Sequence, residues 1–128
     1  MAVFGLTDEQ SDAQVCNNAV AAATEMRQRL ASYNQRLASE SQVTLENGIG
    51  IHFGDVVAGC IGSSERVEYT VMGSTVNMAA RIEGQCKKEG VAPLLFSKEV
   101  AEHVAGSRQL GAFGLKGLAQ PVDLFTTD

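Results

Sequence analysis

The amino-acid sequence predicts an α+β fold, a two-layer α/β sandwich in which helices pack against a sheet. One long stretch and one shorter stretch have apolar residues at spacings of three and four, which is typical of amphipathic helices. Several other stretches have apolar residues at every second position, which is typical of half-buried strands. Since helical and extended stretches alternate along only 128 residues, we expect a single domain without repeats.

The N-terminal part of the chain predicts a long helix after a short apolar run. The run MAVFG, residues 1–5, has no polar lead-in and is typical of the end of a buried strand. A short N-terminal edge strand explains it equally well. Ser11 and Gln14 then form a capping-box signature. Apolar residues recur with helical spacing from Val15 to Leu37, so we expect one long amphipathic helix.

The middle of the chain predicts a hairpin and a further strand. From Val43 to Phe53 the apolar period changes to two, which predicts a half-buried strand. Gly54-Asp55 is a turn signal of hairpin type, so residues 56–61 are predicted to return beside that strand. Another strand is expected from Val67 to Met72.

A second helix is predicted after Gly73. Ser74 or Thr75 can cap its N-terminus, and Gly90 suits its C-terminal end. The remaining predicted elements are a strand at residues 94–96, a brief helix from Ser97 to about Val104, and a final hairpin of residues 109–115 and 122–125.

The composition excludes several classes of function. Ten Lys and Arg against fifteen Asp and Glu give a formal charge of -5, so nucleic acid is not an expected partner. Cys16, Cys60 and Cys86 form no CxxC pattern, which argues against a disulfide framework or a zinc site and fits a reducing cytoplasm. No stretch approaches the roughly 20 apolar residues that cross a bilayer. We therefore expect no direct membrane insertion, although a longer parent protein can be membrane-tethered.

Two polar features are the candidates for chemistry. Asn77 and Arg81 are four residues apart and share one face of the second predicted helix, with Ser74 one turn earlier. The planar guanidinium of arginine matches phosphate oxygens well. Lys116 stands beside Gly117 in a predicted hairpin turn where the backbone can approach a ligand. By pattern alone, a solvated polar stripe and a solvated turn lysine are the more common explanations.

Other familiar sites are not indicated. His52 and His103 have no second ligand at metal spacing, so we expect both to be structural or solvated. The glycines of residues 48–62 lack the Lys-Ser or Lys-Thr of a phosphate loop. A serine hydrolase is excluded because the sequence has no GxSxG motif.

The segment from Gly48 to Gly84, GIGIHFGDVVAGCIGSSERVEYTVMGSTVNMAARIEG, closely resembles the core signature of the class III adenylyl and guanylyl cyclases. Residues 1–5 resemble the strand after that family's second metal-binding aspartate, and residues 115–117 (LKG) resemble its triphosphate-binding turn. The resemblance covers essentially the whole chain. It implies a ferredoxin-like sandwich of the class III cyclase type, with residues 1–128 as the C-terminal half that lacks the N-terminal strands and helices.

Carried over position by position, the resemblance implies two catalytic and two substrate-binding residues. Asn77 falls where the family orients the ribose, and Arg81 falls where it stabilises the pentavalent phosphorus. Thr70 falls on the adenine-reading position, as in one large bacterial subgroup, and Lys116 falls on the lysine that holds the outer phosphates. Thr70 favours ATP over GTP, since guanylyl enzymes tend to carry Cys there. Ser74 replaces the usual Asp or Asn, a mild departure.

The implied activity is an adenylate cyclase, which converts ATP to cyclic AMP and pyrophosphate in intracellular signalling. The implied cofactor is Mg²⁺ or Mn²⁺, held by aspartates upstream of Met1, so this chain is expected to contain no metal ligand and to be inactive alone. A strand central to the family's sheet also lies upstream, which predicts unpaired edges at Val3-Phe4 and residues 49–53 and poor folding or association. The implied partner is a second cyclase domain, in a homodimer or heterodimer with a dimerisation arm at residues 63–68.

Two alternatives remain open. One is a non-catalytic nucleotide-binding or dimerisation module that regulates a complete cyclase. The other is a ferredoxin-like domain of unrelated function, a group that includes the diguanylate cyclases. The absence of any GGDEF-like string counts against that second group.

Overall fold

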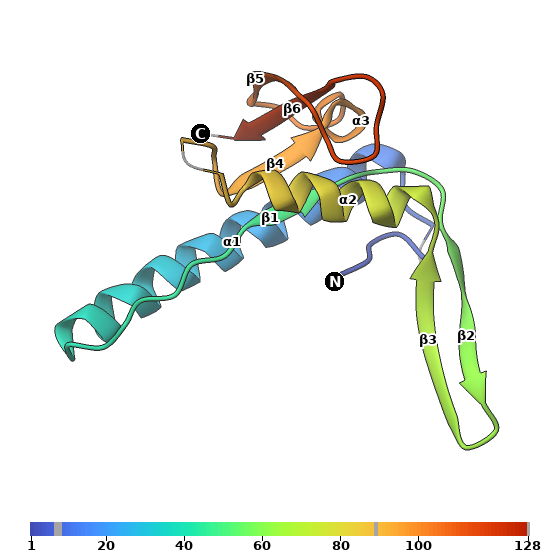
Figure 1. Cartoon of the computed structure of the whole chain (residues 1–128), viewed down its shortest axis with the longest axis horizontal. Helices are drawn as coiled ribbons and strands as arrows, with labels where there is room; N and C mark the ends of the chain where they lie inside the picture. Colours follow the sequence, from blue (N-terminus) through green and yellow to red (C-terminus); the bar gives the residue numbers. More distant parts are fainter. Residues whose placement is uncertain (7–8, 89, 128) are drawn as a thin grey trace.

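The computed structural model describes residues 1–6, 9–88 and 90–127, of which residues 61, 63 and 66–69 are described by their backbone alone. The α+β class expected from the sequence is confirmed (Figure 1). The elements, in chain order, are α1 (Asp12–Ser39), β1 (Ile49–Ile51), β2 (Val57–Ser63), β3 (Arg66–Met72), α2 (Ser74–Gln85), β4 (Leu94–Ser97), α3 (Lys98–Ala101), β5 (Ser107–Phe113) and β6 (Val122–Thr127).

The strands form one mixed sheet and one separate hairpin. The sheet has the order β1-β4-β6-β5, with β1 parallel to β4 and the other neighbours antiparallel. Strands β2 and β3 pair only with each other among the described residues, from Val57 opposite Met72 to Ser63 opposite Arg66. This hairpin projects away from the rest of the molecule (Figure 1). In the described part of the chain β1 is an outermost strand, so its second edge is unpaired, as expected.

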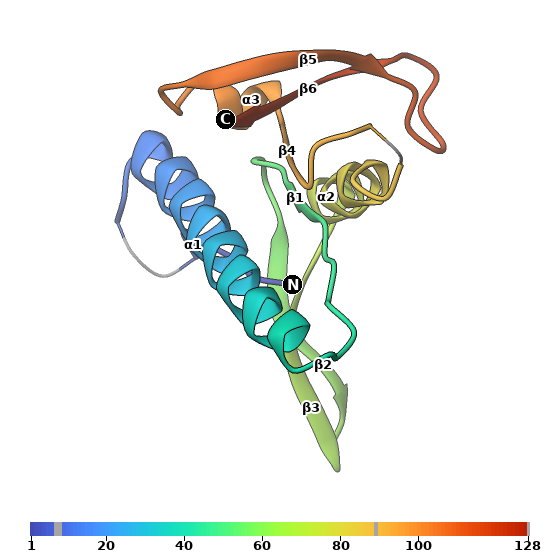
Figure 2. The same ribbon diagram turned by 90° about the vertical axis from the view of Figure 1, so that its left-hand side faces the viewer.

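Two apolar clusters form the core on opposite faces of β4. Leu94 and Phe96 point to one face, where they pack with α1 residues such as Val20. Leu95 points to the other face, where it packs with Ile82 of α2. All four core residues on β4 and α2 are at most 1% exposed. Figure 2 shows β1 between α1 and α2, so the two helices enclose this strand.

The capping-box prediction is confirmed at the start of α1. The Ser11 hydroxyl accepts a hydrogen bond from the Gln14 amide at 3.2 Å, and the Gln14 side chain accepts one from the Ser11 amide at 2.9 Å. At α2 the predicted cap is wrong. Its N-cap is Gly73, at φ 131°, without a side-chain hydrogen bond. Thr75 instead donates its hydroxyl to the carbonyl of Asp55 at 2.6 Å, which ties the β1–β2 loop to the start of α2.

The predicted strand from Val43 to Phe53 and its hairpin with residues 56–61 are wrong. Only Ile49–Ile51 is a strand, and its partner is β4. Val43 and Leu45 are 86% and 53% exposed. The Asn34 side chain forms two hydrogen bonds, of 2.7 and 2.8 Å, with the backbone of Leu45. This backbone is therefore satisfied by α1 rather than by a neighbouring strand.

The N-terminal run is not a strand either, so both readings of residues 1–5 are wrong. Met1, Val3 and Phe4 are 86%, 41% and 39% exposed. Since an extended apolar run is stable as a strand only beside a hydrogen-bonding partner, the reason is that no described strand is paired with it.

His52 is structural, as the sequence predicted. Its Nδ1 atom is 2.7 Å from the Ser97 hydroxyl and 3.8 Å from a Glu99 carboxylate oxygen, and its side chain is 15% exposed. Burial lowers the pKa of His52 below its ordinary 6.5, and the nearby Glu99 carboxylate opposes this only in part. The histidine therefore joins the end of β1 to the β4–α3 junction in its neutral form.

This environment predicts a loss of stability in mild acid. The unfolded chain takes up a proton on His52 near pH 6.5, whereas the folded chain does so only at lower pH, so the free energy of unfolding falls as the pH drops below about 6.5. Urea denaturation between pH 5 and 8 measures this slope. We expect a shallower slope for His52→Asn than for the wild-type chain. An unchanged slope in His52→Asn would refute the assignment.

Candidate functional site

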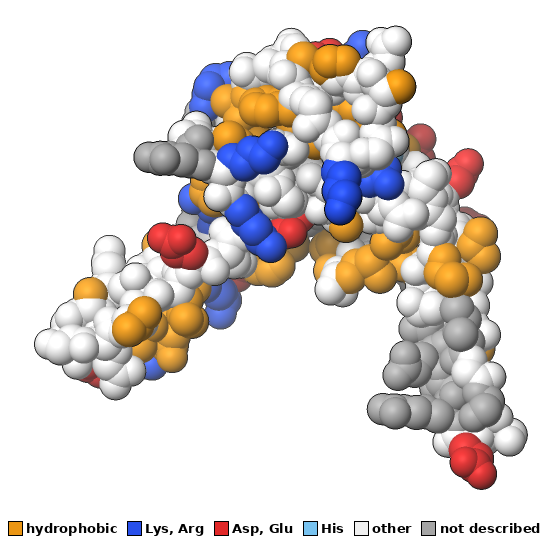
Figure 3. All heavy atoms as spheres, in the orientation of Figure 1, with side chains coloured by type: hydrophobic (Ala, Val, Ile, Leu, Met, Phe, Trp, Pro, Cys, Tyr) orange, Lys and Arg blue, Asp and Glu red, His pale blue; other side chains and the backbone are white. Residues whose placement is uncertain are grey.

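The candidate site includes one face of α2, which carries Asn77 and Arg81. Asn77 is exposed and Arg81 is half-buried. Their spacing of four residues places them one above the other on the helix. Figure 3 shows Lys and Arg side chains gathered over α2 on the face of the molecule that it draws. This face is therefore locally positive although the chain as a whole is negative.

The loop between β5 and β6 is held on α2 by an apolar contact and a hydrogen bond. Leu115 is 4% exposed and belongs to the same cluster as Ile82. The Gln85 side-chain amide donates to the carbonyl oxygen of Gly114 at 3.3 Å. Lys116, next in the chain to the buried Leu115, is exposed. The loop backbone is thus fixed while the lysine reaches into solvent.

Arg81 lies directly against this loop. A methyl group built on Gly117 would be 3.1 Å from Nη2 and 3.5 Å from Cζ of Arg81. The guanidinium therefore lies close to the residue that follows Lys116. Among the described residues, neither Arg81 nor Lys116 forms an ion pair with a carboxylate. Two cationic residues without an acidic partner are suited to an anion with several charged oxygens.

Thr70 lies on a different element from the other three candidates. It is half-buried in β3, opposite Gly59 of β2. No hydrogen bond of the described residues connects it to Asn77, Arg81 or Lys116. Among the described residues the structure therefore brings Arg81 of the helix pair close to the lysine turn, and no hydrogen bond links Thr70 to them.

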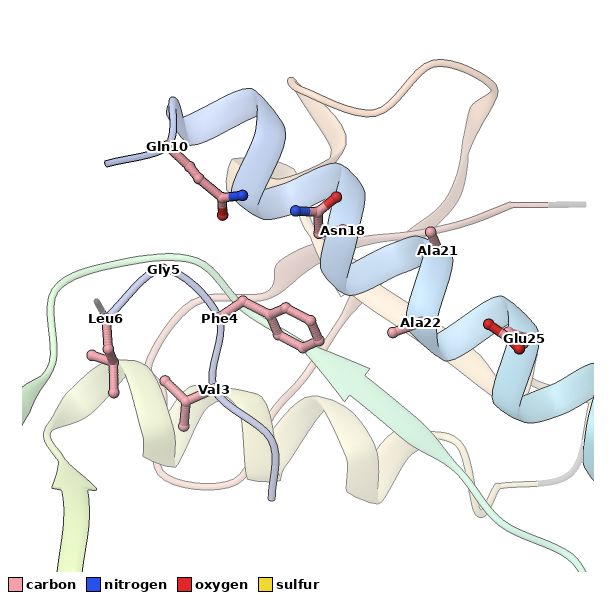
Figure 4. Close-up of a pocket in the computed structure, with 9 residues that line it drawn as sticks. All are labelled: Val3, Phe4, Gly5, Leu6, Gln10, Asn18, Ala21, Ala22 and Glu25. Carbon is pink, nitrogen blue, oxygen red and sulfur yellow. The ribbon is translucent and has the colours of Figure 1, made fainter. Parts of the chain in front are cut away.

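Two hollows of the described residues lie elsewhere. A pocket of about 630 Å³ lies between the N-terminal segment and α1, where Phe4 faces Asn18 and Ala22 (Figure 4). A larger hollow of about 900 Å³ continues from it along β1 and α2. Neither is lined by any of the four candidate residues. Asn77 and Lys116 are exposed, so the candidate site is defined by its charge and packing rather than by either hollow.

The described residues do not fit a metal ion. They contain no group of three or more His, Cys, Asp or Glu side chains that could hold one. They also contain no helix with the length and apolar character required to span a membrane.

The sequence analysis did not identify Gln85 or the hydrogen bond from Thr75 to the Asp55 carbonyl. Gln85 follows Asn77 and Arg81 at the same spacing of four, and this continuation was the signal that could have found it. Thr75 was considered only as a cap, because a bond to a loop twenty residues away leaves no mark in the local pattern.

Comparison with known proteins decides the family. The profile of the adenylate and guanylate cyclase catalytic domain matches residues 1–110. The chain belongs to this family. Adenylate cyclase 1 of Rhizobium meliloti is 32% identical over 117 residues, which are 90% of this chain. Adenylate cyclase of Anabaena cylindrica is 36% identical over 91 residues, which are 68% of it.

The solved structures show that this cyclase chain has the class III cyclase fold. The adenylyl cyclase CyaB from P. aeruginosa superposes with a TM-score of 0.84 at 26% identity, over 95% of this chain and 63% of that one. The guanylyl cyclase Cya2 superposes with a TM-score of 0.78 at 32% identity, over 95% of this chain and 61% of that one. The chain spans 18% of the length of each of the two curated relatives.

Proposed function

We propose that residues 1–128 are the C-terminal, substrate-binding half of an adenylate cyclase catalytic domain, which converts ATP to cyclic AMP and pyrophosphate. The observation that most supports this is the contact of the Arg81 guanidinium with Gly117, because it joins the helix cation to the lysine turn. Family membership supports the reaction class. The named adenylate cyclases among the relatives support ATP as substrate.

In the proposed reaction each of the four residues has one task. The ribose 3'-hydroxyl gives up its proton to solvent as its oxygen attacks the α-phosphorus and forms a new O–P bond. The bond from the α-phosphorus to the oxygen that bridges to the β-phosphorus breaks, and pyrophosphate leaves with the electron pair. Arg81 stabilises the negative charge that grows on the α-phosphate oxygens. Lys116 holds the outer phosphates. Asn77 orients the ribose, and Thr70 reads the adenine.

A second cyclase domain completes the site in this proposal. Mg²⁺ or Mn²⁺, the metals of the family, stabilise phosphate charge when bound. Because the described residues offer no cluster to hold these metals, their ligands lie outside this chain in this proposal. In the proposed head-to-tail dimer one subunit contributes the metal ligands, and this chain contributes Thr70, on the projecting β2–β3 hairpin (Figure 1), together with Asn77, Arg81 and Lys116.

A second candidate function is a non-catalytic subunit that binds nucleotide or a complete cyclase and regulates it. The observation that favours it is again that the described residues contain no metal-binding cluster. It predicts association with a complete cyclase domain without turnover at the site formed by this chain.

One complementation experiment separates the two functions. The chain is mixed with a complete class III adenylate cyclase domain in which the arginine corresponding to Arg81 is alanine. If the chain is the substrate-binding half, the mixture produces cyclic AMP although neither component does so alone. A complex that forms without cyclic AMP production supports the regulatory subunit. Cyclic AMP production by the purified chain alone would contradict the proposed division of the site.

Gly117→Ala tests the Arg81 contact within this mixture. The new methyl group would lie 3.1 Å from Nη2 of Arg81, so the guanidinium must shift by a few tenths of an ångström, and φ of +81° is strained for alanine. We expect cyclic AMP production to fall by up to about 10-fold, less than the roughly 100-fold that a misplacement of about 1 Å can cost. Gly106→Ala is the matched control, because its φ is +80° and no atom lies within 4 Å. Equal losses of activity in both variants would show that backbone strain alone is responsible.

A further inference from the structure

Gln85 is a buried polar residue that the proposed reaction does not use. It is 6% exposed and lies in the last turn of α2. A buried amide is unfavourable unless it is hydrogen-bonded, so its partner shows what the residue is for. Its Nε2 atom donates to the carbonyl oxygen of Gly114 at 3.3 Å. This bond joins residues 29 positions apart and links α2 to the β5–β6 loop.

The bond fixes one end of a short segment whose other end lies near Arg81. Gly114 precedes Lys116 by two residues, and Gly117, near which the Arg81 guanidinium lies, follows it directly. Between them the buried Leu115 anchors the segment beside Ile82, and the Leu118 amide donates to the Leu115 carbonyl at 3.2 Å. Residues 114 and 115 are therefore attached to α2 immediately before Lys116.

We propose that Gln85 is a positioning residue for the nucleotide site. It holds the backbone of residues 114–117 against α2, so that Lys116 and Arg81 can reach the same triphosphate. A lysine side chain loses much rotational freedom when it binds, and a mobile backbone would add to that cost. Gln85 itself touches no phosphate in this account. The inference rests on the proposed function, because it assigns Lys116 to the outer phosphates.

A double-mutant cycle tests this role in the chain mixed with the complete cyclase domain described above. The probes are 3'-deoxy-ATP, which binds but cannot cyclise, and 3'-deoxy-AMP, which lacks the outer phosphates. We expect Gln85→Met, which keeps the length but removes the donor, to weaken 3'-deoxy-ATP binding about 3- to 10-fold, the factor that corresponds to one hydrogen bond. Binding of 3'-deoxy-AMP should not change. Lys116→Ala should weaken 3'-deoxy-ATP binding about 10-fold or more, since its bonds are charge-assisted.

The decisive result is the combination of the two substitutions. If Gln85 acts through Lys116, Gln85→Met causes no further loss in the Lys116→Ala background. Additive losses, or equal losses for both probes, would overturn the inference. If Lys116→Ala leaves 3'-deoxy-ATP binding unchanged, the proposed function itself fails. If Lys116→Ala weakens 3'-deoxy-ATP binding but Gln85→Met leaves it unchanged, the role proposed for Gln85 fails and the proposed function stands. Gln85→Leu gives the same comparison should Gln85→Met not fold.

Discussion

Arg81→Ala lowers cyclic AMP production by about 100- to 1,000-fold in the complementation mixture, which is the usual effect of removing one preorganised transition-state donor. The physical reason is that the guanidinium, which lies near Gly117 of the lysine turn, is placed to stabilise the negative charge of the pentavalent phosphorus as it develops. The measurement is the initial rate at saturating ATP. We expect the rate constant to fall more than the apparent affinity for ATP, because the contact strengthens in the transition state.

Two further variants define what this result means. Arg29→Ala is the control, because Arg29 is an exposed arginine on α1 that pairs with Glu25 at 2.8 Å, away from α2. It should leave the rate unchanged. Arg81→Lys keeps the charge but loses the planar fork, so we expect it to recover only part of the activity. A wild-type rate in Arg81→Ala would remove Arg81 from the mechanism.

Gly50→Ala is expected to have the largest effect on folding. Gly50 lies in β1, where a methyl group would be 2.3 Å from the backbone nitrogen of Glu83 and 2.7 Å from the carbonyl oxygen of Ala79. Both atoms belong to the backbone of α2, which cannot move aside as a side chain can. Strand and helix must separate, and we expect a loss of about 1–3 kcal/mol or more in the free energy of unfolding. Urea denaturation measures it.

Gly84→Ala is the matched control for this packing. Gly84 lies within α2, its φ is not positive, and no atom lies within 4 Å of an added methyl group. Alanine is also the better helix former by about 0.5–1 kcal/mol, so we expect equal or higher stability. If Gly50→Ala unfolds at the same urea concentration as the wild type, the close contact between β1 and α2 is not present in solution.

The local signals in the sequence predicted the elements that local contacts stabilise. The Ser11 and Gln14 capping box marks the start of α1, and residues 122–125 mark the last strand. The parallel pairing of β1 with β4 could not be predicted this way, because the partner of Ile49 is Leu94, 45 residues later. Parallel pairing needs no turn signal between its strands. The apolar period of two before β1 was misleading, because the backbone of Leu45 is hydrogen-bonded to the Asn34 side chain and not to a neighbouring strand.

The residues of the candidate site also fall into two groups: those that a local pattern predicts and those that only tertiary contacts bring together. The shared face of Asn77 and Arg81 follows from helical spacing and was predictable. The closeness of Arg81 to the lysine turn depends on the burial of Leu115 beside Ile82, a tertiary contact that no local pattern carries. The tie from Gln85 depends on the same contact. In the sequence, only the resemblance to the cyclases connected Lys116 with the helix that carries Asn77 and Arg81.

The proposed function depends most on the action of Arg81 and Lys116 on one nucleotide. A crystal structure of the complemented assembly with 3'-deoxy-ATP tests this directly. We predict that the Arg81 guanidinium and the Lys116 ammonium both donate hydrogen bonds to phosphate oxygens of the same molecule, with Asn77 beside the ribose. A nucleotide bound in the pocket of Figure 4, or one that Arg81 does not touch, would contradict the account.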